Sequence, residues 1–401
     1  EDECVVCHTD HTPGIVNQYL ASDHFQNNTT CADCHLVEAG TGGAVQHPEA
    51  EFYVLPTSSS GMCQTCHLQE VQQFSLSRHA LPSYVAYAGS ENLSEAHLEL
   101  YQSIPEGGSN PDGRLSARNA IHRLEGMEFT QFTCESCHDV GAPNPDGSVG
   151  DCTACHIRHE FSLEQVRRPE TCNNCHIGPD HPQWEIYEES SHGIAYATMS
   201  DDWNWEAEPG SLTTVDMPAP TCATCHFSGF GGAATTHDAG DRLGWFLAAP
   251  ISTERPNYAE NRLRMQGVCR ACHSDNFIAD FYTSADAATE SINTFVRFSD
   301  AIMQPLKDNG LLTAAPFDEP IDYIYYELWH HYGRTAKSGV WMQGADYAQW
   351  HGVYEILQDL SELVTLANEK LEAAGLEPLV MPEGFPGIDA ARAYLEAQAG
   401  S

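Results

Sequence analysis

The hydrophobic and polar positions divide the chain into two stretches of different character. Residues 1–275 hold short apolar groups separated by Gly, Pro, Asn and Asp, which predicts short helices joined by loops. Residues 277–308, 320–338 and 344–374 have apolar positions at helical spacing and few helix breakers, which predicts long helices. We therefore expect a mainly α fold with little β structure, with a core at 1–275 and a helical domain at 276–401.

Clusters of Gly, Pro and Asp predict where the chain turns. Segments 104–117 and 142–150 are predicted surface loops. Segment 377–387 holds three Pro and two Gly, so we expect a loop there, followed by a last short helix at 388–398. No run of about 18 or more apolar residues occurs, so the sequence predicts no membrane-spanning helix.

The charge of the chain is strongly negative. The sequence has 57 acidic and 18 basic residues, a formal net charge of −39, and only three of the basic residues are lysines. Such a surface repels nucleic acid and anionic lipid, and it favours solubility and a basic or small neutral partner. We therefore expect no nucleic-acid partner. The sequence also contains no nucleotide-binding loop and no hydrolase triad.

The sixteen cysteines all fall in pairs of one pattern. So many cysteines in an exported chain suggest disulfides, but here each pair has the spacing C-x-x-C and is followed by histidine. The eight motifs are Cys4-Val-Val-Cys7-His8, Cys31-Ala-Asp-Cys34-His35, Cys63-Gln-Thr-Cys66-His67, Cys134-Glu-Ser-Cys137-His138, Cys152-Thr-Ala-Cys155-His156, Cys172-Asn-Asn-Cys175-His176, Cys222-Ala-Thr-Cys225-His226 and Cys269-Arg-Ala-Cys272-His273.

The C-x-x-C-H pattern is the attachment site of c-type haem. The two thiols reach the two vinyl groups of one porphyrin, and the next residue brings its imidazole to the iron. Zinc knuckles and redox-active C-x-x-C pairs do not require histidine after every pair. The sequence therefore predicts eight covalently bound c-type haems in residues 1–275, with the eight motif histidines as proximal iron ligands.

Thirteen further histidines are candidates for the second axial position of each iron. They are His11, His24, His47, His79, His97, His122, His159, His181, His192, His237, His330, His331 and His351. An iron with two His ligands is saturated and passes electrons, whereas an iron with an open position binds substrate. Counting alone allows either eight saturated haems or seven and one open haem, and Met is a further candidate ligand.

The location of the protein is predicted from the same features. The chain opens at Glu1-Asp2-Glu3-Cys4 without a charged segment followed by an apolar one, so we expect either that a signal peptide has been removed or that there never was one. With its acidic surface and its haem motifs, we expect an exported protein of the periplasm or the extracellular space.

Several short strings follow the fourth to seventh motifs in a definite order. They are Arg158-His159-Glu160-Phe161-Ser162, Arg168-Pro169-Glu170, Asp180-His181-Pro182-Gln183-Trp184, Ser191-His192-Gly193 and Asp202-Trp203-Asn204-Trp205-Glu206. In this order the strings resemble the octahaem hydroxylamine oxidoreductase family, and the resemblance extends from Cys4 to about residue 360. It is weakest before Cys63 and between 277 and 325.

The resemblance implies a division of labour among the haems. Seven are expected to have two His ligands, and the fourth, at Cys134, Cys137 and His138, is expected to be catalytic with an open distal face. The implied distal ligands of the other seven are His24, His47, His79, His159, His192, His237 and one of His330 or His331. The pairing of these histidines with particular haems is left open.

The family's distal pocket contains an Asp-His pair that matches Asp180 and His181. A histidine near the iron exchanges protons near neutral pH, and the adjacent carboxylate orients it. The alternative is that His181 is itself a haem ligand. The family also implies a homotrimer, a small nitrogenous substrate, and a redox partner protein or quinol-linked cytochrome.

Two departures from the family change the expected activity. Oxidative members cross-link a tyrosine of a neighbouring subunit to the catalytic haem, and Gln343 stands in that position here, with Tyr347 four residues away as the alternative. Phe246 stands where a pocket tyrosine is expected, which removes a hydrogen-bond donor. Because members without the cross-link resemble reductases, we expect reduction of nitrite or hydroxylamine.

Two other functions remain as alternatives. One is oxidation of hydroxylamine or hydrazine, and the other is electron transfer without catalysis, as in an extracellular conduit or filament. The net charge of −39 repels nitrite at long range, although salt screens much of this repulsion beyond about 8–10 Å. Neutral hydroxylamine is not subject to this repulsion.

Overall fold

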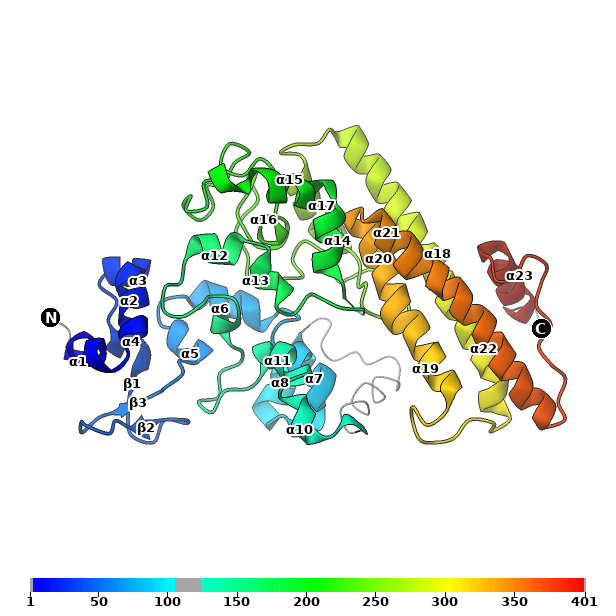
Figure 1. The fold of residues 1–401 in the computed structure, drawn as a ribbon, viewed down its shortest axis with the longest axis horizontal. Coiled ribbons are helices and arrows are strands. Elements are labelled where there is room, and N and C mark those ends of the chain that lie inside the picture. The colour runs from blue at the N-terminus through cyan, green and yellow to red at the C-terminus, as the bar shows by residue number, and fades with distance from the viewer. Residues whose placement is uncertain (1–2, 105–123, 180, 400–401) are drawn as a thin grey trace. The chain divides into compact units, whose positions relative to one another are not determined.

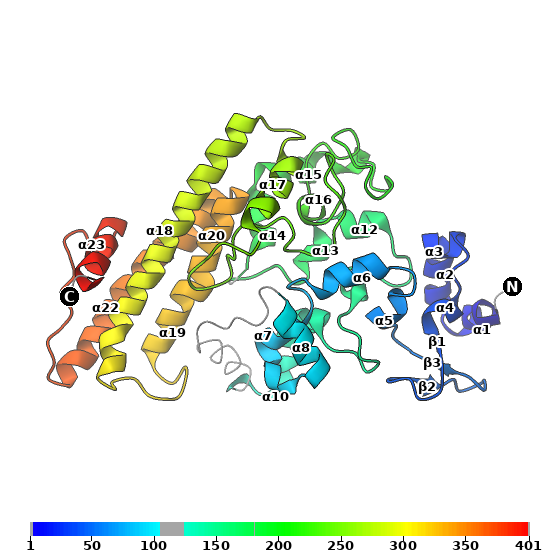
Figure 2. The ribbon, with the colours of Figure 1, turned by 180° about the vertical axis from the view of Figure 1, so that it is seen from behind.

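The computed structural model describes residues 3–104, 124–179 and 181–399 (Figure 1). The chain is divided into two compact units, which Figure 2 shows from behind. The first contains Glu1–Cys175, Asp201–Leu243 and Glu260–Ala271, and the second contains His176–Ser200, Gly244–Ala259 and Cys272–Ser401. The domain division at 1–275 and 276–401 stays a prediction.

The fold is mainly helical, which confirms the predicted class. The strands of the described residues form one small antiparallel sheet in the first unit, in the order β1-β3-β2. These strands are β1 (Leu36–Val37), β2 (Val45–Gln46) and β3 (Tyr53–Val54). Each has only two residues, so the sheet adds little to the core.

The first unit consists of short helices separated by loops. Its described helices are α1 (Glu3–His11), α2 (Pro13–Ala21), α3 (Asp23–Gln26), α4 (Cys31–His35), α5 (Ser60–Cys63), α6 (Leu68–Ser75), α7 (Leu81–Ala88), η1 (Ser90–Asn92), α8 (Glu95–Ser103), α10 (Met127–Thr130), α11 (Cys134–His138), η2 (Asp139–Gly141), η3 (Cys152–Ala154), α12 (Leu163–Arg167), α13 (Glu170–Asn173) and α16 (Cys222–His226). Two further helices, η4 (Ser200–Asp202) and α17 (Tyr258–Cys269), begin in the second unit and end in the first.

Side-chain caps explain where several of these helices start. Ser22 accepts a hydrogen bond from the Phe25 N–H at the start of α3, and Ser162 accepts one from the Gln165 N–H at the start of α12. Each serine satisfies a backbone donor that has no partner inside its helix. Helices of four or five residues are marginal alone, so tertiary contacts and bound groups must hold them.

The second unit contains the long helices and several short ones. They are α14 (Gln183–Glu189), α15 (Ser191–Met199), α18 (Asp275–Asp308), α19 (Pro320–Glu327), the π-helix η5 (Leu328–Tyr332), α20 (Gly333–Met342), α21 (Ala345–Ala348), the π-helix η6 (Gln349–Val353), α22 (Tyr354–Ala373) and α23 (Ile388–Ala399). Helices α18 and α22 pack side by side (Figure 1, Figure 2).

The core of this helical unit follows from apolar spacing along α18 and α22. Phe298, Ile302 and Leu306 recur every four residues on α18 and are fully buried. Leu360 and Leu363 lie on the facing side of α22 and are fully buried as well. This spacing puts each set on one face of its helix, so the two faces form one apolar interior.

The sequence predictions for this unit are confirmed with small changes. The helix predicted at 277–308 begins at Asp275, where Ser274 caps it by accepting from the Phe277 N–H. The stretch predicted to end at residue 338 continues through η5 and α20 to Met342 and ends where Gln343 adopts a left-handed conformation, with φ of 59°. The predicted loop at 377–387 contains no helix, and α23 follows it.

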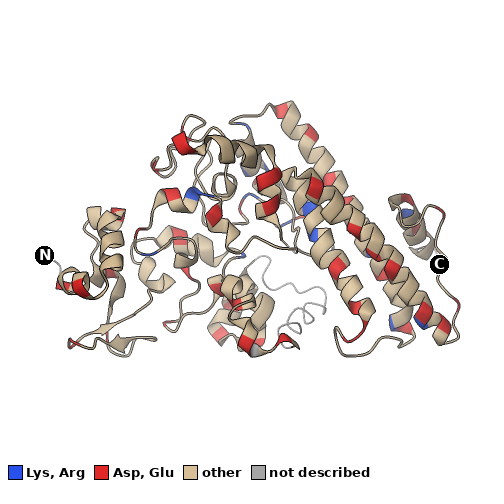
Figure 3. Ribbon diagram, viewed as in Figure 1, with Lys and Arg blue, Asp and Glu red and all other residues tan. Residues whose placement is uncertain are grey.

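The remaining predictions concern the loops and the surface. Segment 142–150 is a loop, whereas most of segment 104–117 lies outside the described residues. Asp and Glu are spread along the helices of both units, and Lys and Arg are few (Figure 3). In the part of the chain that the structure describes, every helix is too short or too polar to cross a membrane.

Candidate functional site

Short helical turns position the cysteine and histidine side chains of the motifs. The second, fourth and seventh motifs each form a complete turn, as α4, α11 and α16. In a helical turn, residues three and four positions apart share a face, so the two thiols and the histidine of a motif point to the same side. A single flat group with two attachment points and a central metal fits this arrangement.

Six motif histidines face a histidine from outside the motifs. Ring centroids are 6.3 Å apart for His8–His47, 6.1 Å for His67–His24, 6.1 Å for His35–His159, 6.2 Å for His156–His237, 6.0 Å for His176–His181 and 6.1 Å for His273–His192. Two imidazoles on opposite sides of one metal, each bonded at about 2 Å, have centroids about 6 Å apart. Each pair therefore fits one haem iron between its rings.

Hydrogen bonds at Nδ1 orient several motif histidines. His35 Nδ1 donates to the Leu55 carbonyl at 2.6 Å, and His138 Nδ1 donates to the Ser83 carbonyl at 2.8 Å. His176 Nδ1 lies 3.2 Å from Gln183 Oε1. Donation from Nδ1 fixes the tautomer and leaves the Nε2 lone pair for a metal.

Burial favours the neutral form of five of the facing histidines. Burial, with a smaller effect of neighbouring histidines, lowers the pKa of His156 to about 4. Burial also lowers the pKa of His24, His159, His192 and His237 below the ordinary value. Neutral imidazole is the form that binds metal, so these surroundings suit axial ligands.

Thiols of different motifs touch within the first unit. Cys63 of the third motif contacts Cys152 of the fifth. Cys175 of the sixth motif contacts Cys137 of the fourth. Haems attached at such thiols would lie close to one another, and electrons could then pass from motif to motif.

This path continues through the sixth motif. Its Cys172 contacts Cys222 of the seventh motif, and Cys225 of the seventh interacts with Cys269 of the eighth. The sixth motif therefore adjoins both the fourth and the seventh. The order of the motifs in space differs from their order along the chain.

The fourth motif lies against helix α7. Ser83 holds His138 twice, because its carbonyl accepts from Nδ1 and its hydroxyl donates to the His138 carbonyl at 3.1 Å. The Tyr87 ring lies 5.9 Å from the His138 ring, and its hydroxyl donates to Asp139 at 2.7 Å. Burial, followed by this carboxylate, raises the pKa of Tyr87, so the phenol stays protonated. Sequence reasoning missed Ser83 and Tyr87, because no motif marks them.

Of the two predicted distal-pocket residues, the structure describes His181, in the second unit. Asp180 lies outside the described residues. His181 lies opposite the sixth motif's own His176, at the spacing of the other facing pairs. Gln183, two residues later, lies beside His176 Nδ1 and donates to Ser338 Oγ at 3.3 Å.

The other predicted ligands lie in two places. The His79 ring stacks on Phe227 at 6.3 Å, next to His226 of the seventh motif. His330 is 7% exposed and stacks on Tyr326 at 4.3 Å, and His331 lies beside it at 5.3 Å. Both lie on η5, whose π-helical geometry turns consecutive side chains differently from an α-helix.

The residues of the expected cross-link region lie in the second unit. Gln343 ends α20, and the Tyr347 ring packs on His351 at 4.9 Å. The Nε2 atom of His351 also lies 3.3 Å from Oδ2 of Asp346. The Phe246 N–H donates to the Thr253 carbonyl in a loop of the same unit.

Repeated attachment motifs with facing histidines define a multihaem c-type cytochrome. The family model described as "Seven times multi-haem cytochrome CxxCH" matches residues 114–320, which is more than half of the chain. The chain belongs to this family, and it binds c-type haems covalently.

One curated relative is similar to about half of this chain. A probable nitrite reductase-hydroxylamine oxidoreductase fusion protein of Kuenenia stuttgartiensis is 30% identical over 234 residues, which cover 56% of this chain and 25% of that protein. The chain thus spans a quarter of the length of this curated relative.

Two solved structures share the fold. A hypothetical multiheme protein matches with a TM-score of 0.77 and 22% identity, over 93% of this chain and 95% of that one. A reducing HAO-like protein complex of Kuenenia stuttgartiensis matches with a TM-score of 0.65 and 21% identity, over 93% of this chain and 86% of that one.

Proposed function

We propose that the chain is an exported octahaem cytochrome that reduces nitrite or hydroxylamine at the haem of the fourth motif. Each of the eight C-x-x-C-H motifs holds one haem through its two cysteines and its histidine. The array of facing histidine pairs carries the proposal, because reduction of nitrite to ammonia takes several electrons and saturated haems store and pass them. The fusion protein of Kuenenia stuttgartiensis, whose printed name joins nitrite reductase to hydroxylamine oxidoreductase, supports the substrate class.

Five of the proposed distal ligands have a partner from their ring spacing. They are His47 for His8, His159 for His35, His24 for His67, His237 for His156 and His192 for His273. We assign His79 to His226, because His79 stacks on the residue that follows this motif histidine. His330 or His331 is then the ligand left for the sixth haem.

The chain's own residues supply position and protons at the reaction site. His138, held by Ser83, orients the fourth haem, and Asp180 with His181 delivers protons to the substrate as its N–O bonds break. When bound, the haem iron supplies the site that takes up the nitrogen compound and passes electrons to it. The contact between Cys137 and Cys175 supports electron supply from the sixth haem.

A second candidate function rests on the spacing of His176 and His181. At 6.0 Å their rings are placed like the other facing pairs, which favours His181 as an axial ligand. His181 then delivers no protons, and where another histidine closes the fourth iron the chain is an electron carrier, as in an extracellular conduit. Oxidation of hydroxylamine or hydrazine is the third candidate function. It requires a tyrosine cross-linked to the catalytic haem. Gln343 has no phenol that could form this bond, whereas Tyr347 has one.

One experiment separates these functions. Turnover of nitrite and hydroxylamine is measured with a reduced viologen as electron donor, together with the electron paramagnetic resonance spectrum of the resting protein. Turnover with a high-spin haem supports the reductase, whereas only low-spin haems and no turnover support the carrier. A red-shifted band in the ferrous spectrum reveals a cross-linked haem and supports oxidation.

A further inference from the structure

Two arginines are enclosed beside the seventh motif. Arg242 is 2% exposed and Arg167 is 4% exposed, although the chain has only 18 basic residues. Burying a charged guanidinium is unfavourable unless hydrogen bonds satisfy its donors. Both guanidinium groups therefore need hydrogen-bond acceptors inside the protein.

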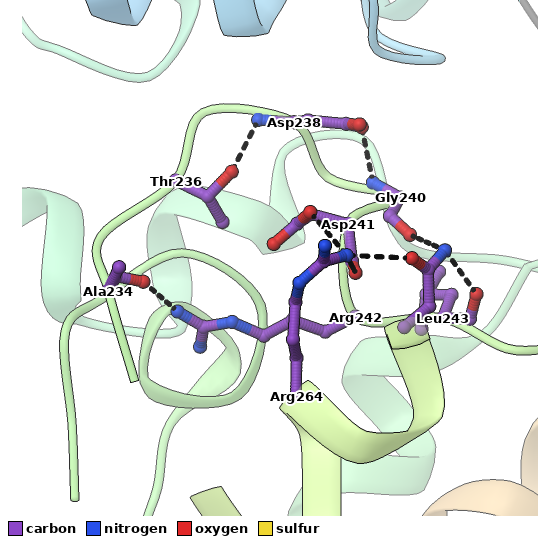
Figure 4. Close-up of polar contacts among 9 residues, drawn as sticks. Ala234, Thr236, Asp238, Gly240, Asp241, Arg242, Leu243 and Arg264 are labelled. Atoms are coloured by element: carbon purple, nitrogen blue, oxygen red, sulfur yellow. Dashed lines mark hydrogen bonds and ion pairs between the residues drawn. The ribbon is translucent and has the colours of Figure 1, made fainter. Parts of the chain in front are cut away.

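Arg242 donates only to backbone carbonyls in its described contacts. Nη1 lies 3.2 Å from the Thr224 oxygen and 2.9 Å from the Cys225 oxygen, and both residues belong to the seventh motif. Nη2 reaches the Ser228 oxygen at 2.8 Å and the Ala234 oxygen at 2.6 Å, and Figure 4 shows the bond to Ala234. One side chain thus ties the end of α16 to the loop that follows it.

These hydrogen bonds leave the positive charge of Arg242 in place, because carbonyl oxygens carry no net charge. The neighbouring carboxylate of Asp241 forms an ion pair with Arg264 at 3.0 Å (Figure 4). Arg264 is half exposed, so its ion pair is screened by solvent, whereas Arg242 is enclosed.

Arg167 holds the other end of the motif. Its backbone oxygen accepts from the Thr221 hydroxyl at 2.7 Å, and Thr221 caps α16 immediately before Cys222. The guanidinium of Arg167 donates to the Trp205 carbonyl. The seventh motif is therefore held at its start by the Arg167 backbone oxygen and at its end by the Arg242 guanidinium.

We propose that Arg242, with Arg167, positions the seventh motif and raises the reduction potential of the haem attached at Cys222 and Cys225. A fixed positive charge in a buried environment stabilises the reduced haem, which carries one more electron than the oxidised form. The seventh motif adjoins the sixth through Cys222 and the eighth through Cys225.

The raised reduction potential makes the seventh haem the preferred site for electrons among the haems. An electron resting on the seventh haem is next to the sixth haem, which in turn borders the fourth motif at Cys137. This role as a store for the reaction rests on the proposed function, whereas the raised potential does not. Measuring the potential without substrate therefore tests the inference separately from the activity.

The test is a spectroelectrochemical titration of the purified holoprotein and four variants. His226→Met first identifies the seventh haem, because a Met ligand raises the potential of the haem it binds. In Arg242→Gln we expect the same component to move to lower potential while the others stay in place. Arg264→Gln, which removes a neighbouring but half-exposed guanidinium, is the matched control and is expected to leave every component unchanged.

Arg242→Lys distinguishes charge from shape. Lysine keeps the positive charge but cannot reach four carbonyls, so we expect the seventh component to stay near its original potential. Equal shifts in the Gln and Lys variants, or no shift in either, overturn the electrostatic role. Loss of one haem from both variants, measured by mass spectrometry, also overturns it, because Arg242 then acts on the structure of the motif alone.

Discussion

His35 and His159 face each other with ring centroids 6.1 Å apart, although His35 belongs to the second motif and His159 follows the fifth. His35 is fixed by donation from Nδ1 to the Leu55 carbonyl, and burial lowers the pKa of His159. The His35 imidazole is therefore oriented with Nε2 toward His159, and burial favours the neutral form of His159 that binds metal. Distant segments of the chain thus meet at the second haem site.

The first prediction concerns this pair. We expect His159→Ala to convert one low-spin haem to a high-spin haem, because the iron bound to His35 loses its second axial ligand. Electron paramagnetic resonance of the oxidised protein measures the change. His97→Ala is the control, because His97 contacts the Gly147 carbonyl at 2.9 Å, away from the facing pairs. An unchanged spectrum in His159→Ala contradicts the proposed pairing.

The second prediction concerns the role of His181. If His181 delivers protons, His181→Ala lowers nitrite or hydroxylamine turnover by about 100-fold or more and adds no high-spin haem. The viologen assay and the resonance spectrum are recorded on the same sample, with His97→Ala again as control. A new high-spin signal in His181→Ala instead identifies His181 as the partner of His176.

The third prediction concerns the helical core of the second unit. Leu360 is fully buried between α22 and its neighbours, so Leu360→Ala removes buried contacts and leaves a cavity. We expect the free energy of unfolding to fall by about 2–5 kcal/mol, measured by denaturant titration of the holoprotein. Val380 is 83% exposed, so Val380→Ala is expected to change it by less than about 0.5 kcal/mol. Equal effects of the two substitutions contradict the packing described for α22.

The fourth prediction concerns pH and Lys337. This side chain is fully buried on α20 and donates to the Ala249 and Pro250 carbonyls at 3.3 and 3.0 Å. Burial, with a smaller effect of Arg334, lowers the pKa of Lys337 to about 7 from 10.5. Between these two pH values the unfolded chain binds the proton and the native chain does not, so stability rises with pH across this window.

Comparison of two proteins measures this effect. The free energy of unfolding from pH 7 to pH 10 is expected to rise less steeply in Lys337→Met than in the unchanged protein, by at most about 1.4 kcal/mol per pH unit. Arg392→Met, at a half-exposed position on α23, is the control and is expected to keep the original slope. Parallel curves for the unchanged protein and Lys337→Met exclude titration of this lysine in the window.

Local sequence predicted the helices of the second unit well. The apolar positions of α18 repeat at helical spacing, and Ser274 supplies the cap that starts the helix. The same pattern did not reveal η5 and η6, where a π-helical turn interrupts an otherwise continuous helix. Helical periodicity depends on residues three and four positions apart, so it does not register one extra residue in a turn.

The sequence by itself determined that this chain attaches c-type haems, because each attachment uses two thiols and a histidine within one helical turn. Only the tertiary structure decided which distant histidine faces which motif and which motifs touch. It also decided that Arg167 and Arg242 bind the two ends of the seventh motif. These relationships depend on the path of the chain between the motifs. A local pattern contains the chemistry of one attachment site, but the fold alone brings the second ligand and the neighbouring charges to it.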